Sequence, residues 1–169
     1  MPITGLLHVA IKTEDLDTTV AFYTRLLGLR LAPRPDFGYP GAWIAVPTPV
    51  GEAVIHIYAG GPALGRDGTV TPGTGAIDHV SITAVGWNDF RDRFARAGLP
   101  WREFLIPGTT YWQLFVYDPS GVQLELTFDA HAEGIATPVV TDAMRYRAGD
   151  SFFDRAAYTG LAARLAAFA

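Results

Sequence analysis

One six-residue pattern occurs twice in the chain, as LLHVAI at residues 6–11 and as IDHVSI at residues 77–82. Apolar side chains in each copy recur as in a half-buried β-strand, and histidine holds the third place, as His8 and His79. A stretch with helical spacing follows each copy. A repeat of this kind predicts two tandem copies of one supersecondary unit.

A second polar position recurs later in each copy. The apolar strand AVIHIY at residues 53–58 carries His56, and the strand QLELT at residues 123–127 carries Glu125. Polar side chains at equivalent strand positions suggest a sheet with approximate twofold symmetry. We therefore expect His8, His56, His79 and Glu125 to point inward at one place.

Each repeat is expected to have the order β-α-β-β-β, within one domain over residues 1–129. Repeat 1 covers about residues 5–59, with strands 6–11, 29–32, 42–46 and 53–58 and a helix that begins at Asp15 and ends at Gly28. Repeat 2 covers about residues 76–128, with strands 77–84, 101–104, 111–117 and 123–128 and a helix over 88–97.

Two further segments lie around this repeated core. The loop 33–41 is rich in Pro and Gly and carries Phe37 and Tyr39, so it is either a lid over a pocket or a surface loop that packs its own aromatic rings. Residues 130–169 form a C-terminal extension whose last part, 152–168, has the spacing of an amphipathic helix.

Composition excludes several classes of function. The chain has 169 residues, 49% hydrophobic and 18% charged, which is typical of a globular domain. With 13 basic and 17 acidic residues it offers no basic surface for nucleic acid, and no apolar run approaches the roughly 20 residues that span a membrane. We expect no signal peptide and a cytoplasmic protein. Since cysteine is absent, any metal must be held by nitrogen and oxygen.

The repeated polar positions point to a metal site. A single histidine on an apolar strand is usually a core residue with a hydrogen-bond partner, and Glu125 alone would be a surface carboxylate. Two histidines and one carboxylate at equivalent positions match a set that binds Fe(II), Mn(II), Ni(II) or Zn(II) and leaves positions open for substrate. We predict that His8, His79 and Glu125 bind a divalent metal ion.

These residues resemble the vicinal oxygen chelate superfamily, which includes glyoxalase I, fosfomycin- and bleomycin-resistance proteins, methylmalonyl-CoA epimerase and extradiol dioxygenases. The resemblance covers residues 5–128 and is most specific at 7–11, at 77–82 and in FVYDPSGVQLEL at 115–126. It implies an α+β fold in which the two units curl into a cupped, mostly antiparallel sheet around a metal held by His8, His79 and Glu125. It also implies a homodimer, in some members with repeats exchanged between chains.

His56 has two possible roles under this resemblance. In glyoxalase I-like and epimerase-like members the equivalent residue is Glu or Gln and is a fourth metal ligand. In extradiol dioxygenases a histidine in this region stays off the metal and acts as acid–base catalyst, as a free imidazole with a pKa near neutrality can. The remaining alternative is a buried histidine bonded to a neighbouring side chain.

An extradiol-dioxygenase-like oxygenase is our first hypothesis, with Fe(II) as metal, His56 as catalytic residue and a small aromatic or enolisable substrate. The second is a glyoxalase-like lyase or isomerase that stabilises a metal-bound enediolate with Ni(II), Zn(II) or Mn(II). A bleomycin-resistance-like binding protein ranks last. Phe115 stands where the dioxygenases have Tyr, and no basic cluster suits the carboxylates of glutathione, so neither enzyme hypothesis matches fully.

Aromatic side chains are the candidates for contact with the small-molecule substrate. The strand positions of Trp43, Tyr58 and Phe115 are compatible with facing into the cup. The alternative for each ring is that it fills the core between sheet and helix.

Overall fold

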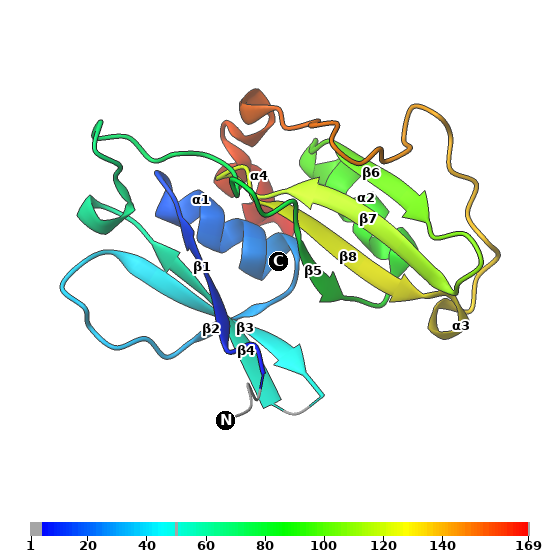
Figure 1. Cartoon of the computed structure of the whole chain (residues 1–169), viewed down its shortest axis with the longest axis horizontal. Helices are drawn as coiled ribbons and strands as arrows, with labels where there is room; N and C mark the ends of the chain where they lie inside the picture. Colours follow the sequence, from blue (N-terminus) through cyan, green and yellow to red (C-terminus); the bar gives the residue numbers. More distant parts are fainter. Residues whose placement is uncertain (1–4, 50, 169) are drawn as a thin grey trace. The chain divides into compact units, whose positions relative to one another are not determined.

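The computed structural model describes residues 5–49 and 51–168, so residues 1–4, Val50 and Ala169 of the expected domain and extension lie outside the described residues. The chain forms two compact units (Figure 1). Unit 1 takes in the described residues up to Pro72 and from Gly160 onward, and unit 2 runs from Gly73 to Thr159. Each unit contains one of the two sequence repeats.

Unit 1 is built on a four-stranded mixed sheet with the order β1-β4-β3-β2. β1 runs parallel to β4, and the other two pairings are antiparallel. The strands are β1 (His8–Lys12), β2 (Arg30–Ala32), β3 (Gly41–Thr48) and β4 (Gly51–Tyr58).

One helix covers the sheet of unit 1. It begins as α1 (Leu16–Ala21) and continues as the π-helical turn η1 (Phe22–Leu26), whose apolar side chains are buried. Asp15 caps it as expected, because its Oδ1 accepts a hydrogen bond from the backbone N–H of Thr18 at 3.0 Å. A short turn, η2 (Gly61–Ala63), follows the sheet.

Unit 2 repeats this plan with the sheet order β5-β8-β7-β6. Again the first strand runs parallel to the last, and the other pairings are antiparallel. Its elements are β5 (Val80–Thr83), α2 (Trp87–Ala97), β6 (Trp101–Leu105), β7 (Tyr111–Tyr117) and β8 (Gln123–Asp129). The predicted α+β fold with two tandem β-α-β-β-β units is confirmed.

The helix of unit 2 is capped from the C-terminal extension. A short helix not expected from the sequence, α3 (Ala130–Glu133), directly follows β8. The Glu133 carboxylate accepts hydrogen bonds from the backbone N–H groups of Gly86 at 3.0 Å and Trp87 at 2.7 Å, at the N-terminus of α2. A carboxylate there pairs with N–H groups that have no partner within the helix.

The rest of the extension differs from the expected single helix over 152–168. Three short helices replace it: η3 (Arg155–Tyr158) in unit 2, then α4 (Leu161–Leu165) and η4 (Ala166–Phe168) in unit 1. The break falls at Thr159, which is extended, and Gly160, whose φ of 69° is left-handed. Left-handed backbone interrupts a helix, and glycine adopts it without strain.

Two boundaries of the expected strands are also shifted. The predicted strands 6–11 and 77–84 begin only at His8 and Val80, and Leu6, Leu7 and Ile77 are exposed. Among the described residues, no helix is long and apolar enough to cross a membrane.

Candidate metal centre

Unit 2 brings His79 and Glu125 together on one face of its sheet. His79 directly precedes β5, and Ser81, two residues later, lies opposite Glu125 of β8. Residues two apart on a strand face the same side. The imidazole Nε2 of His79 therefore lies 3.2 Å from Oε2 of Glu125.

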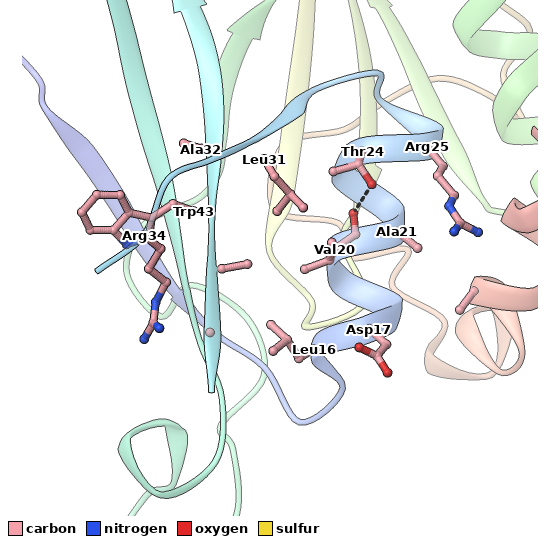
Figure 2. A pocket seen from close by; sticks show the side chains of 13 residues that line it. Leu16, Asp17, Val20, Ala21, Thr24, Arg25, Leu31, Ala32, Arg34 and Trp43 are labelled. Carbon is pink, nitrogen blue, oxygen red and sulfur yellow. Dashed lines mark hydrogen bonds between the residues drawn. The ribbon is translucent and has the colours of Figure 1, made fainter. Parts of the chain in front are cut away.

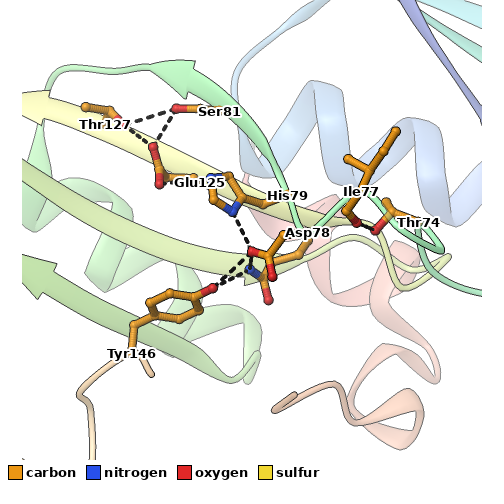
Figure 3. A network of polar contacts seen from close by, with 9 residues as sticks. Thr74, Ile77, Asp78, His79, Ser81, Glu125, Thr127 and Tyr146 are labelled. Carbon is orange, nitrogen blue, oxygen red and sulfur yellow. Dashed lines mark hydrogen bonds and ion pairs between the residues drawn. The ribbon is translucent and has the colours of Figure 1, made fainter. Parts of the chain in front are cut away.

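Hydrogen bonds from neighbouring residues fix the orientation of both side chains (Figure 3). Oδ1 of Asp78 lies 2.6 Å from Nδ1 of His79, and this hydrogen bond lowers the pKa of Asp78. The ionised carboxylate accepts a proton held on Nδ1, so Nε2 carries the lone pair. The hydroxyls of Ser81 and Thr127 each donate to Oε1 of Glu125 at 2.6 Å, which leaves Oε2 toward His79.

This arrangement directs two electron-pair donors at each other. A neutral imidazole with its proton on Nδ1 and an ionised carboxylate both present lone pairs across the 3.2 Å gap between Nε2 and Oε2. A cation beside both atoms, or a second proton on the imidazole, makes the contact favourable. Two ligands at right angles around an ion about 2.1 Å away lie roughly 3 Å apart, so the pair fits a divalent metal.

Unit 1 holds its pair, His8 and His56, in the same relative position. His56 of β4 lies opposite Ala10 of β1, and His8 is two residues before Ala10. In each unit, a histidine therefore lies two residues before the residue that faces the second polar side chain across the parallel strand pair. The sequence repeat is therefore also a repeat of side-chain position.

The rings of this pair are stacked. The centroids of the His8 and His56 rings lie 4.1 Å apart with an angle of 11° between their planes. On its other face His56 stacks on Trp43 of β3, at 4.4 Å and 4°. A histidine binds a metal through a lone pair in the plane of its ring, so parallel rings direct their lone pairs along separate planes.

The surroundings of His56 favour its neutral form. Burial lowers its pKa below 6.5 first, and electrostatic interactions with His8 and Arg34 lower it further. The ring is partly accessible from solvent. It can therefore accept a proton from a bound molecule.

The two pairs belong to different units. Among the residues that the structure describes, no three His, Asp or Glu side chains are placed so that all could hold one metal ion. Each unit contributes two of the four predicted side chains: His8 and His56 from unit 1, and His79 and Glu125 from unit 2.

The predicted substrate-contacting rings lie on the same faces as these pairs. Trp43 lies opposite His56, Tyr58 is two residues beyond His56, and Phe115 lies opposite Glu125. Trp43 and Tyr58 are half-buried, whereas Phe115 is only 2% exposed because the ring of Tyr146 covers it. The ring that meets solvent at this point is that of Tyr146.

Loop 33–41 packs its aromatic rings against the face of unit 1 that carries His56. Phe37 lies 6.1 Å from Trp43, and Tyr39 lies 5.8 Å from Tyr58 between ring centroids. The guanidinium group of Arg34 sits about 5 Å from the centres of the Phe37 and Tyr39 rings. In this structure the loop is in direct contact with Trp43 and Tyr58 through its own aromatic rings.

A family model described as the Glyoxalase/Bleomycin resistance protein/Dioxygenase superfamily matches residues 5–126. The chain belongs to this superfamily. The match spans nearly all of both repeats and includes His8, His56, His79 and Glu125, in agreement with the resemblance recognised from the sequence. Its members include lyases and dioxygenases, with divalent metals typical among them.

Individual members of the superfamily are similar to this chain at low identity. A lactoylglutathione lyase from Escherichia coli O157:H7 is 27% identical over 127 residues, covering 72% of this chain and 90% of the relative. A fosfomycin resistance protein from Listeria monocytogenes has a TM-score of 0.55 and 17% identity over 75% of this chain and 94% of its own. A lactoylglutathione lyase from Agrobacterium tumefaciens has a TM-score of 0.52 and 17% identity over 76% and 96%.

Sequence reasoning missed the residues that orient the side chains of His79 and Glu125. Asp78 and Ser81 lie within the superfamily match, and Thr127 and Tyr146 lie beyond its end at residue 126. The alternation of side chains along a strand could have predicted two of them. Ser81 is two residues from His79 and Thr127 is two residues from Glu125, so each lies on the same face as its partner. Nothing in the sequence pattern links Tyr146 to Asp78.

A pocket of about 640 Å³ in unit 1 lies apart from the paired histidines. Figure 2 shows Leu16 and Val20 of α1 and Leu31 of β2 facing the space between helix and strand, while Trp43 and Arg34 point to the other side of the strand. The sheet therefore separates most of this pocket from the face that carries His56. It has no counterpart in the sequence predictions.

Proposed function

We propose that this chain is a divalent-metal-dependent enzyme that acts on a small molecule able to chelate the metal. His8, His79 and Glu125 are the proposed ligands. The observation that carries the proposal is the contact between Nε2 of His79 and Oε2 of Glu125, two lone-pair donors held 3.2 Å apart by Asp78, Ser81 and Thr127. A cation beside both atoms makes such a contact favourable.

The proposed metal site combines one ligand from unit 1 with two from unit 2. His8 joins the ligands of unit 2, because its position in unit 1 repeats that of His79. We propose a homodimer, as is common in the superfamily, and measurement of the molar mass in solution by light scattering tests it. Ligands of nitrogen and oxygen suit Fe(II), Ni(II), Zn(II) or Mn(II).

His56 is the proposed proton carrier. Its ring is parallel to that of His8, which supports a place off the metal, and its lowered pKa supports a neutral base. Trp43 holds the ring from its other face, so the position of the accepting nitrogen is restricted. Trp43 and Tyr58 supply flat or edge-on surface beside His56 for the carbon skeleton of a substrate.

The reaction that we favour is a lyase or isomerase reaction. A bound divalent metal supplies Lewis-acid polarisation of a carbonyl oxygen. His56 then removes a proton from the carbon beside that carbonyl and returns it at the neighbouring atom. The curated relatives of the chain named lactoylglutathione lyase support this choice over our first hypothesis, the oxygenase.

An extradiol-type oxygenase is the second candidate, and the stacking of His56 favours it equally. In that reaction an off-metal histidine takes a phenolic proton from an aromatic substrate. The proposed ligands and His56 would have the same roles in both reactions, and only the oxygenase would consume dioxygen.

The test is the metal content of protein purified without oxygen, followed by two assays. One assay follows exchange of carbon-bound protons of hydroxyketones in D2O by NMR, and the other follows oxygen uptake with a set of catechols. Bound metal with proton exchange and no oxygen uptake supports the lyase or isomerase. Iron with catechol-dependent uptake establishes the oxygenase instead, and protein that binds no divalent metal refutes the proposal.

A further inference from the structure

Part of the C-terminal extension runs along the sheet of unit 2. It lies beyond residues 5–126, the part of the chain that matches the superfamily. The backbone N–H of Glu103 in β6 donates to the carbonyl of Met144 at 2.7 Å, and the N–H of Tyr146 donates to the carbonyl of Glu103 at 2.9 Å. Figure 1 shows this segment, in orange, crossing beside β6. These bonds fix the backbone of residue 146.

The side chain of Tyr146 reaches the ligand-bearing face of the sheet. Its ring stacks on Phe115, with centroids 3.6 Å apart and an angle of 7° between the planes. Phe115 in turn lies opposite Glu125 and contacts the His79 ring edge to face at 5.7 Å. The extension therefore adds a tyrosine directly beside the two proposed ligands of unit 2.

The hydroxyl of Tyr146 ends at Asp78 (Figure 3). It donates to Oδ1 of Asp78 at 3.1 Å and accepts from Nε2 of Gln123 at 3.2 Å. Gln123 also donates to the same Oδ1, at 3.3 Å. This oxygen is the one that holds Nδ1 of His79 at 2.6 Å.

We propose that Tyr146 is a positioning residue for the metal ligand His79, acting through Asp78. This inference rests on the proposed function, because His79 has to be a ligand for its orientation to matter. The Asp78 side chain is 57% exposed and can rotate unless something fixes it. Besides His79 itself, the Tyr146 hydroxyl and Gln123 bond to Oδ1 of Asp78, and the Tyr146 contact is the shorter of these two.

The physical reason is that a histidine ligand is oriented by the partner of its other nitrogen. Removal of such a partner typically weakens metal binding about 10- to 100-fold. Asp78 bonds directly to His79, whereas Tyr146 bonds to Asp78 and is one hydrogen bond further from the metal ligand. We therefore expect Tyr146→Phe to weaken metal binding by about tenfold, at the low end of that range.

The experiment compares Tyr146→Phe with the parent and with Tyr111→Phe. Tyr146→Phe keeps the ring that covers Phe115 and removes only the hydroxyl. Tyr111 lies on the same strand as Phe115 and is 50% exposed, so Tyr111→Phe is the matched control. Calorimetric titration with Ni(II) measures affinity, and 15N NMR of the histidine rings in the metal-free protein measures the tautomer of His79.

The expected result is weaker Ni(II) binding and a partial loss of the Nδ1-protonated form of His79 in Tyr146→Phe alone. In an Asp78→Asn background, Tyr146→Phe should cause no further change, because its effect passes through Asp78. An additive loss in that background overturns the proposal. So does an unchanged His79 signal in Tyr146→Phe.

The two readouts separate this inference from the proposed function. If the parent protein binds no Ni(II) or other divalent metal, the proposed function fails. The NMR measurement on metal-free protein still decides whether Tyr146 positions His79. A changed tautomer in Tyr146→Phe supports that role, and an unchanged one refutes it.

Discussion

Replacement of His56 by glutamine separates the two roles proposed for this residue. The parallel rings of His8 and His56, 4.1 Å apart, send their in-plane lone pairs along separate planes. His56→Gln should therefore keep the metal content of the parent. His79→Gln removes a proposed ligand. It should therefore weaken metal binding more than the roughly 10- to 100-fold that loss of a ligand's outer hydrogen-bond partner causes.

The same substitution should affect turnover and stability in different proportions. Loss of a general base lowers turnover by about 10²- to 10⁴-fold. Loss of the ring contacts with His8 and Trp43, each worth about 0.5–1.5 kcal/mol between well-packed rings, should lower the free energy of unfolding by about 1 kcal/mol because the rings are partly solvated. Such a loss lowers Tm by roughly 2–4 °C in a chain of this size.

The assay is elemental analysis of protein purified without oxygen, with thermal melts of the same samples. His131→Gln is the matched control, since His131 is an exposed histidine on α3 and belongs to unit 2, whereas the ring stack belongs to unit 1. Loss of metal in His56→Gln as complete as in His79→Gln would refute the reasoning. His56 would then be a fourth ligand.

Three further predictions concern the folded scaffold. Gly41→Ala places a Cβ 2.4 Å from the carbonyl oxygen of Ile57, so we expect a loss of about 1–3 kcal/mol in urea unfolding, and an unchanged midpoint would contradict this. Glu133→Ala removes the cap of α2 and should cost about 1–2 kcal/mol by the same measurement, with Glu133→Gln intermediate. The pKa of His56 is lower in the folded than in the unfolded chain, so the unfolded chain binds more protons near and below pH 6.5. Acidification of metal-free protein from about pH 7.5 to 5.5 should lower Tm, and His56→Gln should weaken this dependence; equal slopes would exclude it.

The repeated pattern was sufficient to predict the fold, because alternation and spacing are local properties. His8 and His79 mark equivalent strands in both units, as their equal places in the two patterns required. The helix start at Asp15 followed from its capping side chain. The predicted single helix over 152–168 was wrong. Its apolar spacing continues through Gly160, but the left-handed backbone of Gly160 interrupts the helix.

Contacts between distant segments were beyond the sequence. The strand position of Phe115 correctly placed it on the face of Glu125, but not beneath Tyr146, which comes 31 residues later along an irregular segment. No periodicity fixes where such a segment returns to a sheet. The ring stack of His8, His56 and Trp43 likewise depends on rotamers that the strand pattern leaves open.

The pairing of residues 144–146 with Glu103 has a consequence for the behaviour of the protein at high concentration. β6 is the outermost strand of its sheet, and an outermost strand with free backbone groups is a template for pairing with another chain. The extension occupies that position with its own backbone. A chain shortened to the two repeats would therefore leave the backbone N–H and C=O groups of Glu103 free to pair with another chain.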